Sequence, residues 1–436
     1  MSETPPKGLV IAAPHSGSGK TCLTIGLLRA MARKGVSLSP AKIGPDYIDP
    51  QFHGVAAGVP SVNLDGWAMQ SETLARLGKQ LASHGELTLI EGVMGLFDGA
   101  VKPGVLGHGA TADIARVFDL PVVLVVDCAG MGQSVAALVK GFAEFDPSLK
   151  LAGVILNKLG SLRHVTMMEE ALGKIGVEVL GAVPRFEAMA LPSRHLGLVQ
   201  ACETKELDGR LDEIADHVAG HVDLEALQRV AGSLGFDGLG VSDMRQGIEP
   251  LGTHIAVARD EAFAFFYPHL QTSWREAGAS FSFFSPLQDE APEAGADAVY
   301  LPGGYPELYG EQLAGNQRFM GGLREAAKQG KRVYGECGGY MVLGQGVIDK
   351  QGQRHAMAGL LDLETSFEKR KLHLGYRHVV RPGGSQVFRG HEFHYACVLR
   401  EEGEALYQDI DGEAQHGLVS NAVSGSFVHL IDGESG

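Results

Sequence analysis

The stretch "GLVIAAPHSGSGKT", residues 8–21, decides the fold of the first half of the chain. An apolar run typical of a strand leads into a loop rich in glycine and serine, and an amphipathic helical pattern begins at Lys20. In such a loop, backbone N–H groups point at phosphate oxygens, Lys20 reaches the β- and γ-phosphates, and the Thr21 hydroxyl can bind Mg²⁺. Pro14 occupies the position of the first glycine of the GxxxxGK[ST] pattern, and a plain turn before a helix is the alternative. The strand–loop–helix order predicts an ATP phosphate site at Ser16, Gly17, Ser18, Gly19, Lys20 and Thr21.

Short buried strands and helical patterns alternate on either side of this loop. The runs "LTLIEGV", "LPVVLVVDC" and "LAGVILNK" read as buried strands, and a second series of the same kind begins at "HIAVARD". This alternation predicts an α/β protein of two domains, each a mostly parallel sheet with helices on both faces. We expect an ATP-dependent domain at 1–235, a Gly- and Asp-rich linker at 236–252 and a second domain at 253–436.

Composition narrows the class of protein. The chain has 436 residues and a net charge of −15, which argues against nucleic acid or an anionic membrane as the main partner. Its five cysteines include no CxxC pair, so the pattern indicates neither a disulfide framework nor a zinc site. We read no signal peptide and no apolar stretch of membrane-spanning length, and expect a cytoplasmic enzyme.

Acidic residues follow two of the predicted strands of the first domain. "KIGPDYIDPQFH", residues 42–53, contains Lys42, Asp46 and Asp49, and "LIEGVMGLFDG", residues 89–99, contains Glu91. In open α/β sheets, ligands bind at the carboxyl ends of the strands. We therefore expect Glu91, Thr21 and one of the aspartates, foremost Asp46, at a Mg²⁺ ion. Lys42, Asp46 and Asp49 are the candidates for contact with the substrate carboxylate or its acyl phosphate.

Two of these assignments have plain alternatives. Asp46 and Asp49 would merely cap the turn around Pro45 and Pro50 if they do not serve a metal or a substrate. Asn157, in "ILNK", is a candidate for reading the adenine of ATP, although an asparagine after a strand is often only a turn former.

The stretch "VYGECGGYM", residues 333–341, places a cysteine in a tight turn between a strand and a helix. This is the pattern of a nucleophile elbow, in which glycines such as Gly335, Gly338 and Gly339 allow close backbone packing. Because a helix begins after Cys337, we expect its thiol pKa to be lowered. The remaining cysteines are expected to be buried structural residues: Cys22, Cys128, Cys202 and Cys397.

A thiolate that attacks an acyl group needs a base and an oxyanion hole. "LPGGYPE", residues 301–307, ends a neighbouring strand, and its Gly303 and Gly304 could donate N–H groups together with Gly338. We choose His429 as the base because "GSFVHL" places it like a strand terminus. The other late histidines are His378, His391, His394 and His416.

These patterns resemble known families. The Cys–Gly–Gly elbow, the upstream "LPGGYPE" and the late "FVH" resemble the class I glutamine amidotransferase domain, in which the cysteine releases ammonia from glutamine. The first half resembles the dethiobiotin-synthetase-like P-loop ligases, which activate a carboxylate with ATP. Joined in this order, with "KIGPDYIDPQFH", "LPSRHLGL" and "GHEFHY", they resemble the cobyrinate a,c-diamide synthase family over nearly the whole chain, foremost its aerobic-pathway form.

The resemblance implies amidation of the a and c acetate carboxylates of a corrin ring in cobalamin biosynthesis. It implies an acyl phosphate made with ATP as co-substrate and Mg²⁺ as cofactor, and ammonia released at Cys337. The implied partners are a corrinoid (hydrogenobyrinate or cobyrinate), L-glutamine and ATP, with no nucleic acid and no membrane; a homodimer is left open. We expect "GHEFHY" on the corrin side or at a domain contact.

One position departs from the wider amidotransferase pattern. There the histidine is followed two residues later by a glutamate that orients it, whereas this chain has Ile431. The cobyrinate subgroup is known for lacking that glutamate, so the orienting group is missing or comes from elsewhere.

Other interpretations keep part of this chemistry. The same reaction on cobyrinate or nickel-sirohydrochlorin would leave the motifs almost unchanged, and the related cobyric acid synthase is expected to be longer. A P-loop switch ATPase of the partitioning type, with a non-catalytic partner domain, is the alternative of another class. The elbow at Cys337 and the late His429 argue against it, and such an ATPase would not release glutamate from glutamine.

Overall fold

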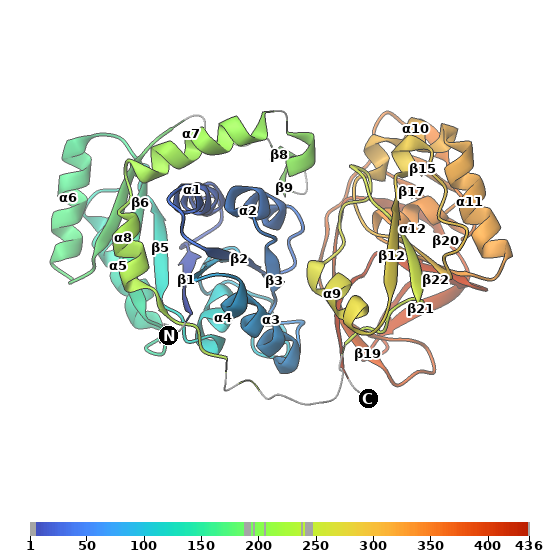
Figure 1. Ribbon diagram of the computed structural model, residues 1–436, viewed down its shortest axis with the longest axis horizontal. Coiled ribbons are helices and arrows are strands. Elements are labelled where there is room, and N and C mark those ends of the chain that lie inside the picture. Colours follow the sequence, from blue (N-terminus) through green and yellow to red (C-terminus); the bar gives the residue numbers. More distant parts are fainter. Residues whose placement is uncertain are drawn as a thin grey trace. The chain divides into compact units, whose positions relative to one another are not determined.

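A computed structural model describes residues 6–186, 193–194, 197–204, 206–236, 239 and 247–434. The chain divides into two compact units, Met1–Asp243 and Met244–Gly436 (Figure 1). Half of "LPSRHLGL", namely Leu191, Pro192, His195 and Leu196, and part of the expected linker lie outside the described residues. Across the described part of the chain, no helix combines the length and apolar character that a membrane span requires.

The first unit is built on a parallel sheet with the order β3-β2-β4-β1-β5-β6-β7. Its central strands are buried along almost their whole length, as expected for a sheet that is covered on both faces. A short strand, β10 (Gly232–Ser233), pairs antiparallel with the start of β1. The parallel strands are β1 (Lys7–Ala12), β2 (Leu38–Ile43), β3 (Val62–Leu64), β4 (Leu87–Glu91), β5 (Val122–Asp127), β6 (Leu151–Leu159) and β7 (Val179–Pro184).

Helices cover both faces of this sheet, with α1, α2 and α7 on one face and α3 and α4 on the other (Figure 1). Helix α1 begins at Lys20, directly after the phosphate loop, and buries an apolar stripe that includes Leu23, Leu27 and Met31. Gly35, just beyond its end, has a φ of 82°, in the left-handed region in which glycine commonly closes a helix. The helices are α1 (Lys20–Arg33), α2 (Asp49–Ala57), α3 (Ser71–His84), α4 (Thr111–Val117), α5 (Ser134–Phe145), α6 (Leu162–Gly173), α7 (Leu207–Ala219) and α8 (Leu224–Val230).

The second unit contains a ten-stranded sheet with the order β12-β11-β13-β14-β23-β22-β21-β18-β19-β24. The α/β class is confirmed, but this sheet is mixed. Along the sheet order, neighbouring strands are parallel from β12 as far as β23, and antiparallel from β23 through β22, β21, β18 and β19 to β24. The expectation of a mostly parallel second sheet was therefore wrong for its C-terminal half, where short connections return the chain beside itself. The strands are β11 (His254–Ala258), β12 (Ser280–Phe284), β13 (Ala298–Leu301), β14 (Arg332–Glu336), β18 (His373–Val380), β19 (Val387–His394), β21 (Glu404–Asp409), β22 (Gln415–Ser420), β23 (Val423–Ser426) and β24 (His429–Glu434).

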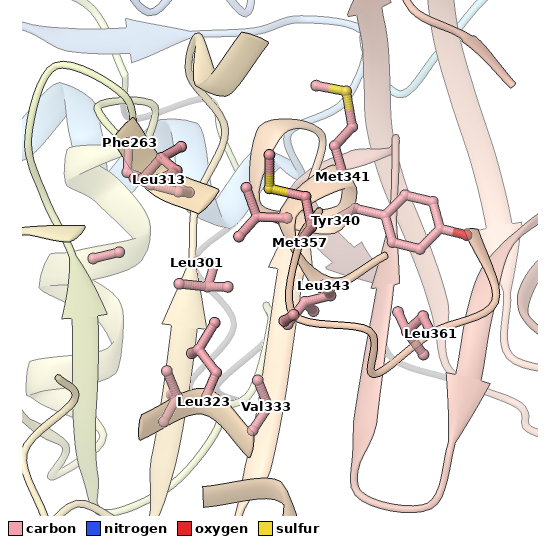
Figure 2. Packing of buried hydrophobic residues seen from close by; sticks show 14 of the residues in the cluster. Phe263, Leu301, Leu313, Leu323, Val333, Tyr340, Met341, Leu343, Met357 and Leu361 are labelled. Atoms are coloured by element: carbon pink, nitrogen blue, oxygen red, sulfur yellow. The ribbon is translucent and has the colours of Figure 1, made fainter. Parts of the chain in front are cut away.

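Two apolar clusters enclose this second sheet. One gathers side chains of β13, β14 and the short helix α12 (Gly338–Leu343), including Leu301, Val333 and Leu343 (Figure 2). The other is aromatic and includes Tyr300 and Tyr334. The packed clusters position the ends of β13 and β14, from which the second site is built. The other helices here are α9 (Pro268–Glu276), α10 (Gly310–Gly315) and α11 (Gln317–Lys328), and a small sheet is formed by β16 (Arg354–Ala356), β15 (Gly346–Ile348), β17 (Leu363–Ser366) and β20 (Cys397–Glu401).

Candidate active sites

The predicted phosphate loop connects β1 to α1, and its glycines are used for their conformation. Gly17 and Gly19 have φ values of 83° and 90°, in the left-handed region that favours glycine. A Cβ on Gly19 would lie 2.3 Å from Nδ2 of Asn157, so any larger residue there would displace the Asn157 side chain. That Nδ2 donates a 2.8 Å hydrogen bond to the carbonyl of Ser18, and Asn157 is buried. The structure thus places Asn157 as a brace of the loop, from the end of β6.

A second brace of the loop was missed in the sequence. Nζ of Lys158 lies 2.8 Å from the carbonyl oxygen of Gly17 and 2.6 Å from Oδ2 of Asp127. Lys158 and Asp127 stand at the carboxyl ends of the neighbouring strands β6 and β5. That position is the signal by which the sequence could have identified them.

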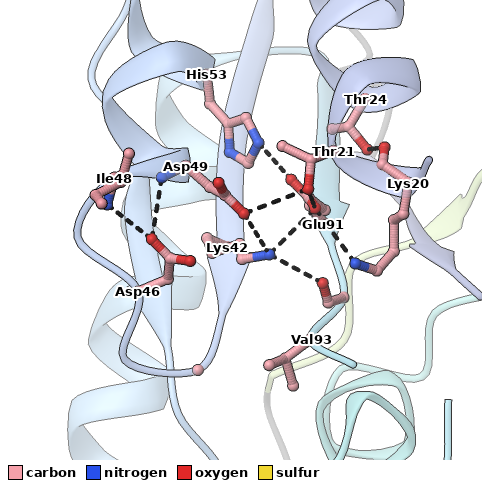
Figure 3. A network of polar contacts seen from close by, with 12 residues as sticks. Lys20, Thr21, Thr24, Lys42, Asp46, Ile48, Asp49, His53, Glu91 and Val93 are labelled. Atoms are coloured by element: carbon pink, nitrogen blue, oxygen red, sulfur yellow. Dashed lines mark hydrogen bonds and ion pairs between the residues drawn. The ribbon is translucent and has the colours of Figure 1, made fainter. Parts of the chain in front are cut away.

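Glu91 is the centre of the acidic cluster at this edge of the sheet (Figure 3). Its Oε1 accepts a 2.6 Å hydrogen bond from the Thr21 hydroxyl and lies 3.1 Å from Nζ of Lys42. The register of the sheet explains the second contact, because Lys42 on β2 stands opposite Glu91 on β4. Nζ of Lys20 lies 3.4 Å from the same oxygen. The structure therefore brings Lys20, Thr21, Lys42 and Glu91 together, which includes the approach of Thr21 to Glu91 that the sequence predicted.

The buried charged groups of this cluster shift one another's pKa values. Burial alone would raise the pKa of Glu91, but Lys42, Lys20 and His53 outweigh it and hold that pKa well below its usual value. Burial lowers the pKa of Lys42, but Glu91 and the nearby aspartates raise it above the ordinary value for lysine. Burial and the neighbouring Lys42 lower the pKa of Lys20. Glu91 is therefore a carboxylate and Lys42 an ammonium at neutral pH.

The two aspartates of "KIGPDYIDPQFH" occupy different places. Oδ2 of Asp49 lies 3.0 Å from Nζ of Lys42 and 3.4 Å from the Thr21 hydroxyl. Asp46 instead accepts hydrogen bonds at Oδ1 from the backbone N–H groups of Ile48 and Asp49, at 2.7 and 3.0 Å. Burial, and then the charge of Asp49, raise the pKa of Asp46 to about 6. The structure thus brings Asp49 to Thr21 and uses Asp46 to cap the turn.

Two functional neighbours were not singled out in the sequence. His53 is fully buried, and its Nε2 lies 2.6 Å from Oε2 of Glu91. Asn63 donates from Nδ2 to the carbonyls of Gly44 and Asp46, at 2.9 and 2.7 Å, and holds the turn between β2 and α2. His53 stands four residues after Asp49, and this one-turn spacing on a helix is the signal that was available.

The donor set of this cluster fits Mg²⁺. Thr21, Asp49 and Glu91 offer hard oxygen ligands, the kind that Mg²⁺ takes in proteins. Within the described ranges, no group of three His, Cys, Asp or Glu side chains is arranged to enclose a metal by itself. A Mg²⁺ ion held here would therefore keep water and phosphate oxygens as most of its ligands.

The second site is formed by the turn between β14 and α12. Cys337 has a φ of 46°, a strained value for a residue with a side chain and the mark of a nucleophile elbow. A Cβ on Gly339 would lie 1.9 Å from the carbonyl oxygen of Leu301, and one on Gly335 would lie 2.7 Å from the backbone of Gly339. Glycine is therefore required at both positions for the turn to pack on β13.

The structure corrects the expectation for the Cys337 thiol. Cys337 is 2 % exposed, and burial, followed by the charge of Glu307, raises its pKa well above the usual value. A hydrogen bond from the Gly338 N–H acts in the opposite direction but does not compensate for the burial. With no ligand bound, Cys337 is therefore a thiol, and a base would have to take its proton before it could attack.

The glycines proposed for the oxyanion hole lie beside this thiol and beside His429. A Cβ on Gly338 would lie 3.0 Å from the backbone nitrogen of Gly304, so the two backbones are adjacent. A Cβ on Gly303 would lie 2.4 Å from Cε1 of His429 and 3.3 Å from its Nε2. His429 starts β24 rather than ending a strand, and it is 2 % exposed.

The histidines of "GHEFHY" lie in this same unit, on β19. The register places His391 opposite His429, and the two rings stack with centroids 5.0 Å apart and planes 13° apart. The Tyr267 hydroxyl also holds His391, at 2.9 Å from its Nε2. His394 stacks on Phe427, two residues before His429. Part of "GHEFHY" therefore surrounds the candidate base.

The other cysteines do not share one environment. Cys128 is buried, as expected, but Cys22 and Cys397 are partly exposed and Cys202 is exposed, so the expectation of burial was wrong for these three. None of the five forms a disulfide in the structure.

Both halves of the chain match known protein families. Residues 9–199 match the CobQ/CobB/MinD/ParA nucleotide binding domain, and residues 254–435 match the CobB/CobQ-like glutamine amidotransferase domain. The chain is 52 % identical to a hydrogenobyrinate a,c-diamide synthase of Brucella anthropi, over 98 % of both chains. It is 52 % identical to the enzyme of that name from Rhodobacter capsulatus, over 99 % of this chain and all of the relative. For the Rhizobium meliloti enzyme the identity is 50 %, over 98 % and 99 %.

Proposed function

The chain belongs to the hydrogenobyrinate a,c-diamide synthases, glutamine-dependent amide-forming enzymes of cobalamin biosynthesis, and from this premise we propose how its two sites divide the reaction. The first unit activates an acetate carboxylate of hydrogenobyrinate with ATP, and the second releases ammonia from glutamine. Two rounds on the a and c side chains give the diamide. Identity of 52 % over nearly the full length of both chains is the observation that carries this assignment.

In the first unit, the phosphate loop and Lys20 hold the triphosphate, and an oxygen of the substrate carboxylate takes the γ-phosphoryl group to give an acyl phosphate and ADP. Thr21, Asp49 and Glu91 would hold Mg²⁺. When bound, Mg²⁺ offsets negative charge on the transferring phosphoryl group. Lys42, paired with Glu91 and Asp49, keeps a fixed positive charge near the incoming carboxylate. Ammonia then attacks the acyl carbon and phosphate leaves, which forms the amide.

In the second unit, Sγ of Cys337 attacks the side-chain amide carbon of glutamine, and His429 takes the thiol proton. The backbone N–H groups of Gly304 and Gly338 stabilise the tetrahedral oxyanion that forms. The position of both backbones beside the nucleophile turn supports this role. The imidazolium returns its proton to the leaving nitrogen, so ammonia departs and a thioester remains. Water hydrolyses the thioester to glutamate and restores the thiol.

Two variants separate the half-reactions. Cys337→Ser should lose glutamine-dependent synthesis but keep synthesis from high ammonium, whereas Lys20→Ala should lose synthesis with both nitrogen donors and retain glutamine hydrolysis. Cys397→Ser is the matched control, since its thiol lies elsewhere in the same unit and merely donates to the carbonyl of Lys369. Products are identified by mass spectrometry with hydrogenobyrinate, cobyrinate and nickel-sirohydrochlorin offered in parallel. Preferred amidation of cobyrinate or nickel-sirohydrochlorin would contradict the proposed substrate. An equal loss of synthesis with glutamine and with ammonium in Cys337→Ser would contradict the proposed role of Cys337.

A further inference from the structure

The carboxylate that usually orients the amidotransferase histidine is absent at Ile431, yet another carboxylate approaches the same ring. Oε2 of Glu336 lies 3.7 Å from Nδ1 of His429. Glu336 is the last residue of β14 and immediately precedes the nucleophile. Both side chains are buried, at 3 % and 2 % exposure.

The Glu336 carboxylate is held in place from several directions. Its Oε2 accepts a 2.8 Å hydrogen bond from the Tyr300 hydroxyl, and its Oε1 accepts one of 3.2 Å from Tyr334. Burial, together with neighbouring charge, raises the pKa of both phenols well above the usual value, so both remain hydrogen-bond donors. The backbone N–H of Leu430, the residue after His429, also donates to Oε1, at 3.3 Å. Glu336 is thus fixed to the segment that carries the base.

The geometry also distinguishes the two nitrogens of the His429 ring. Nδ1 faces Glu336, whereas Nε2 lies on the side of Gly303, beside the nucleophile turn. The neighbouring Glu392 is engaged elsewhere, since it pairs with Arg377 at 2.6 Å and with His416 at 3.4 Å. Ile431 offers its backbone carbonyl to His269 and has no charged side chain to offer.

We propose that Glu336 is the positioning residue of His429 and takes the place of the carboxylate absent at Ile431. It holds the imidazole in the tautomer with the proton on Nδ1, so that the lone pair of Nε2 can accept the proton of Cys337. It then stabilises the imidazolium that forms. The contact of 3.7 Å shortens to a hydrogen bond when glutamine is bound, as catalytic hydrogen bonds commonly do. The nucleophile and the group that orients its base are therefore adjacent in sequence.

Glutamine hydrolysis by Glu336→Gln tests this role. We expect kcat to fall about 10- to 1000-fold, because the amide no longer fixes the tautomer, with KM for glutamine changed less than about twofold. Ammonium-supported synthesis should stay at the wild-type rate. Glu401→Gln is the matched control, since Glu401 also accepts a hydrogen bond from a tyrosine, Tyr340, but does not face His429. A kcat within twofold of wild type in Glu336→Gln, or equal loss of both nitrogen donors, would overturn the proposal.

A second measurement needs only the wild-type enzyme. In ¹⁵N-histidine-labelled protein, with the His429 signals assigned by comparison with His429→Gln, the neutral ring should carry its proton on Nδ1. A proton on Nε2 would overturn the proposal whether or not any variant folds. This inference rests on the proposed function solely for glutamine hydrolysis at Cys337. An enzyme that hydrolyses glutamine but amidates another substrate would contradict the proposed substrate and leave the role of Glu336 intact.

Discussion

Nζ of Lys42 lies 3.1 Å from Oε1 of Glu91, across two neighbouring parallel strands and at matched register. Both side chains are buried, so each stabilises a charge that could not otherwise remain inside the protein. Lys42→Met should therefore destabilise the first unit by about 1–3 kcal/mol, the cost of removing one partner from a buried polar group, because Lys20, Thr21 and His53 still contact Glu91. It should also abolish ATP-dependent synthesis with either nitrogen donor.

Fluorescence offers a direct readout of that unit. The chain has two tryptophans, Trp67 in the first unit and Trp274 in the second, so a Trp274→Phe background leaves Trp67 to report urea unfolding. Arg229→Ala is the control, because Arg229 pairs with Glu178 at the surface and should leave the midpoint nearly unchanged. An unchanged midpoint in Lys42→Met would show that the buried pair contributes nothing to stability.

The two aspartates at the turn before α2 should respond differently to loss of charge. Asp49→Asn removes the charge that faces Lys42 and Thr21, and we expect ATP-dependent synthesis to fall at least about tenfold, with a raised Mg²⁺ requirement. Asp46→Asn keeps an oxygen that can accept from Ile48 and Asp49, so the turn should persist and synthesis should stay within about threefold of wild type. Titration of synthesis with Mg²⁺ separates the two, and a greater loss in Asp46→Asn would reverse the assignment.

Local patterns predicted the components of the first site because parallel strands bring their carboxyl ends to one edge. The approach of Glu91 to Lys42 and Thr21 follows from that rule and from the phosphate-loop motif. The different positions of Asp46 and Asp49 do not follow from it, since they depend on how α2 starts. The contact of His53 with Glu91 depends on which face of α2 is buried.

The second site was less accessible to sequence reasoning. The elbow at Cys337 was evident from its glycines, but the raised pKa of its thiol comes from packing between β13, β14 and α12, which no local pattern describes. The place of His391 beside His429 depends on the antiparallel pairing of β19 with β24. That half of the sheet was not predicted, because strands such as β18, β19 and β22 are partly polar and lack the continuous apolar runs by which buried parallel strands are recognised.

The protonated state of Cys337 in the free enzyme predicts its reactivity. Because burial raises the pKa of this thiol, the fraction of thiolate should keep increasing with pH throughout the range from 7 to 9. The rate of alkylation by iodoacetamide, followed by mass spectrometry of the peptide that contains Cys337, should rise across this range without levelling off. A rate that is already constant near pH 7 would indicate a thiolate formed before substrate binds.

The stacked pair of His391 and His429 predicts which ring is the base. Burial, and then the proximity of His429, hold the pKa of His391 well below its usual value, so His391 is neutral at neutral pH. His391→Phe keeps a flat ring against His429 and loses the hydrogen bond with Tyr267, so glutamine hydrolysis should fall less than about tenfold. His429→Ala should reduce kcat by about 10²–10⁴, because no base remains for the Cys337 proton. Both variants should keep ammonium-supported synthesis, because that reaction belongs to the first unit, and urea unfolding followed by the fluorescence of Trp274 checks the folding of the second unit. If His391→Phe lost as much glutamine hydrolysis as His429→Ala, the base would have to be shared between the two rings or assigned to His391.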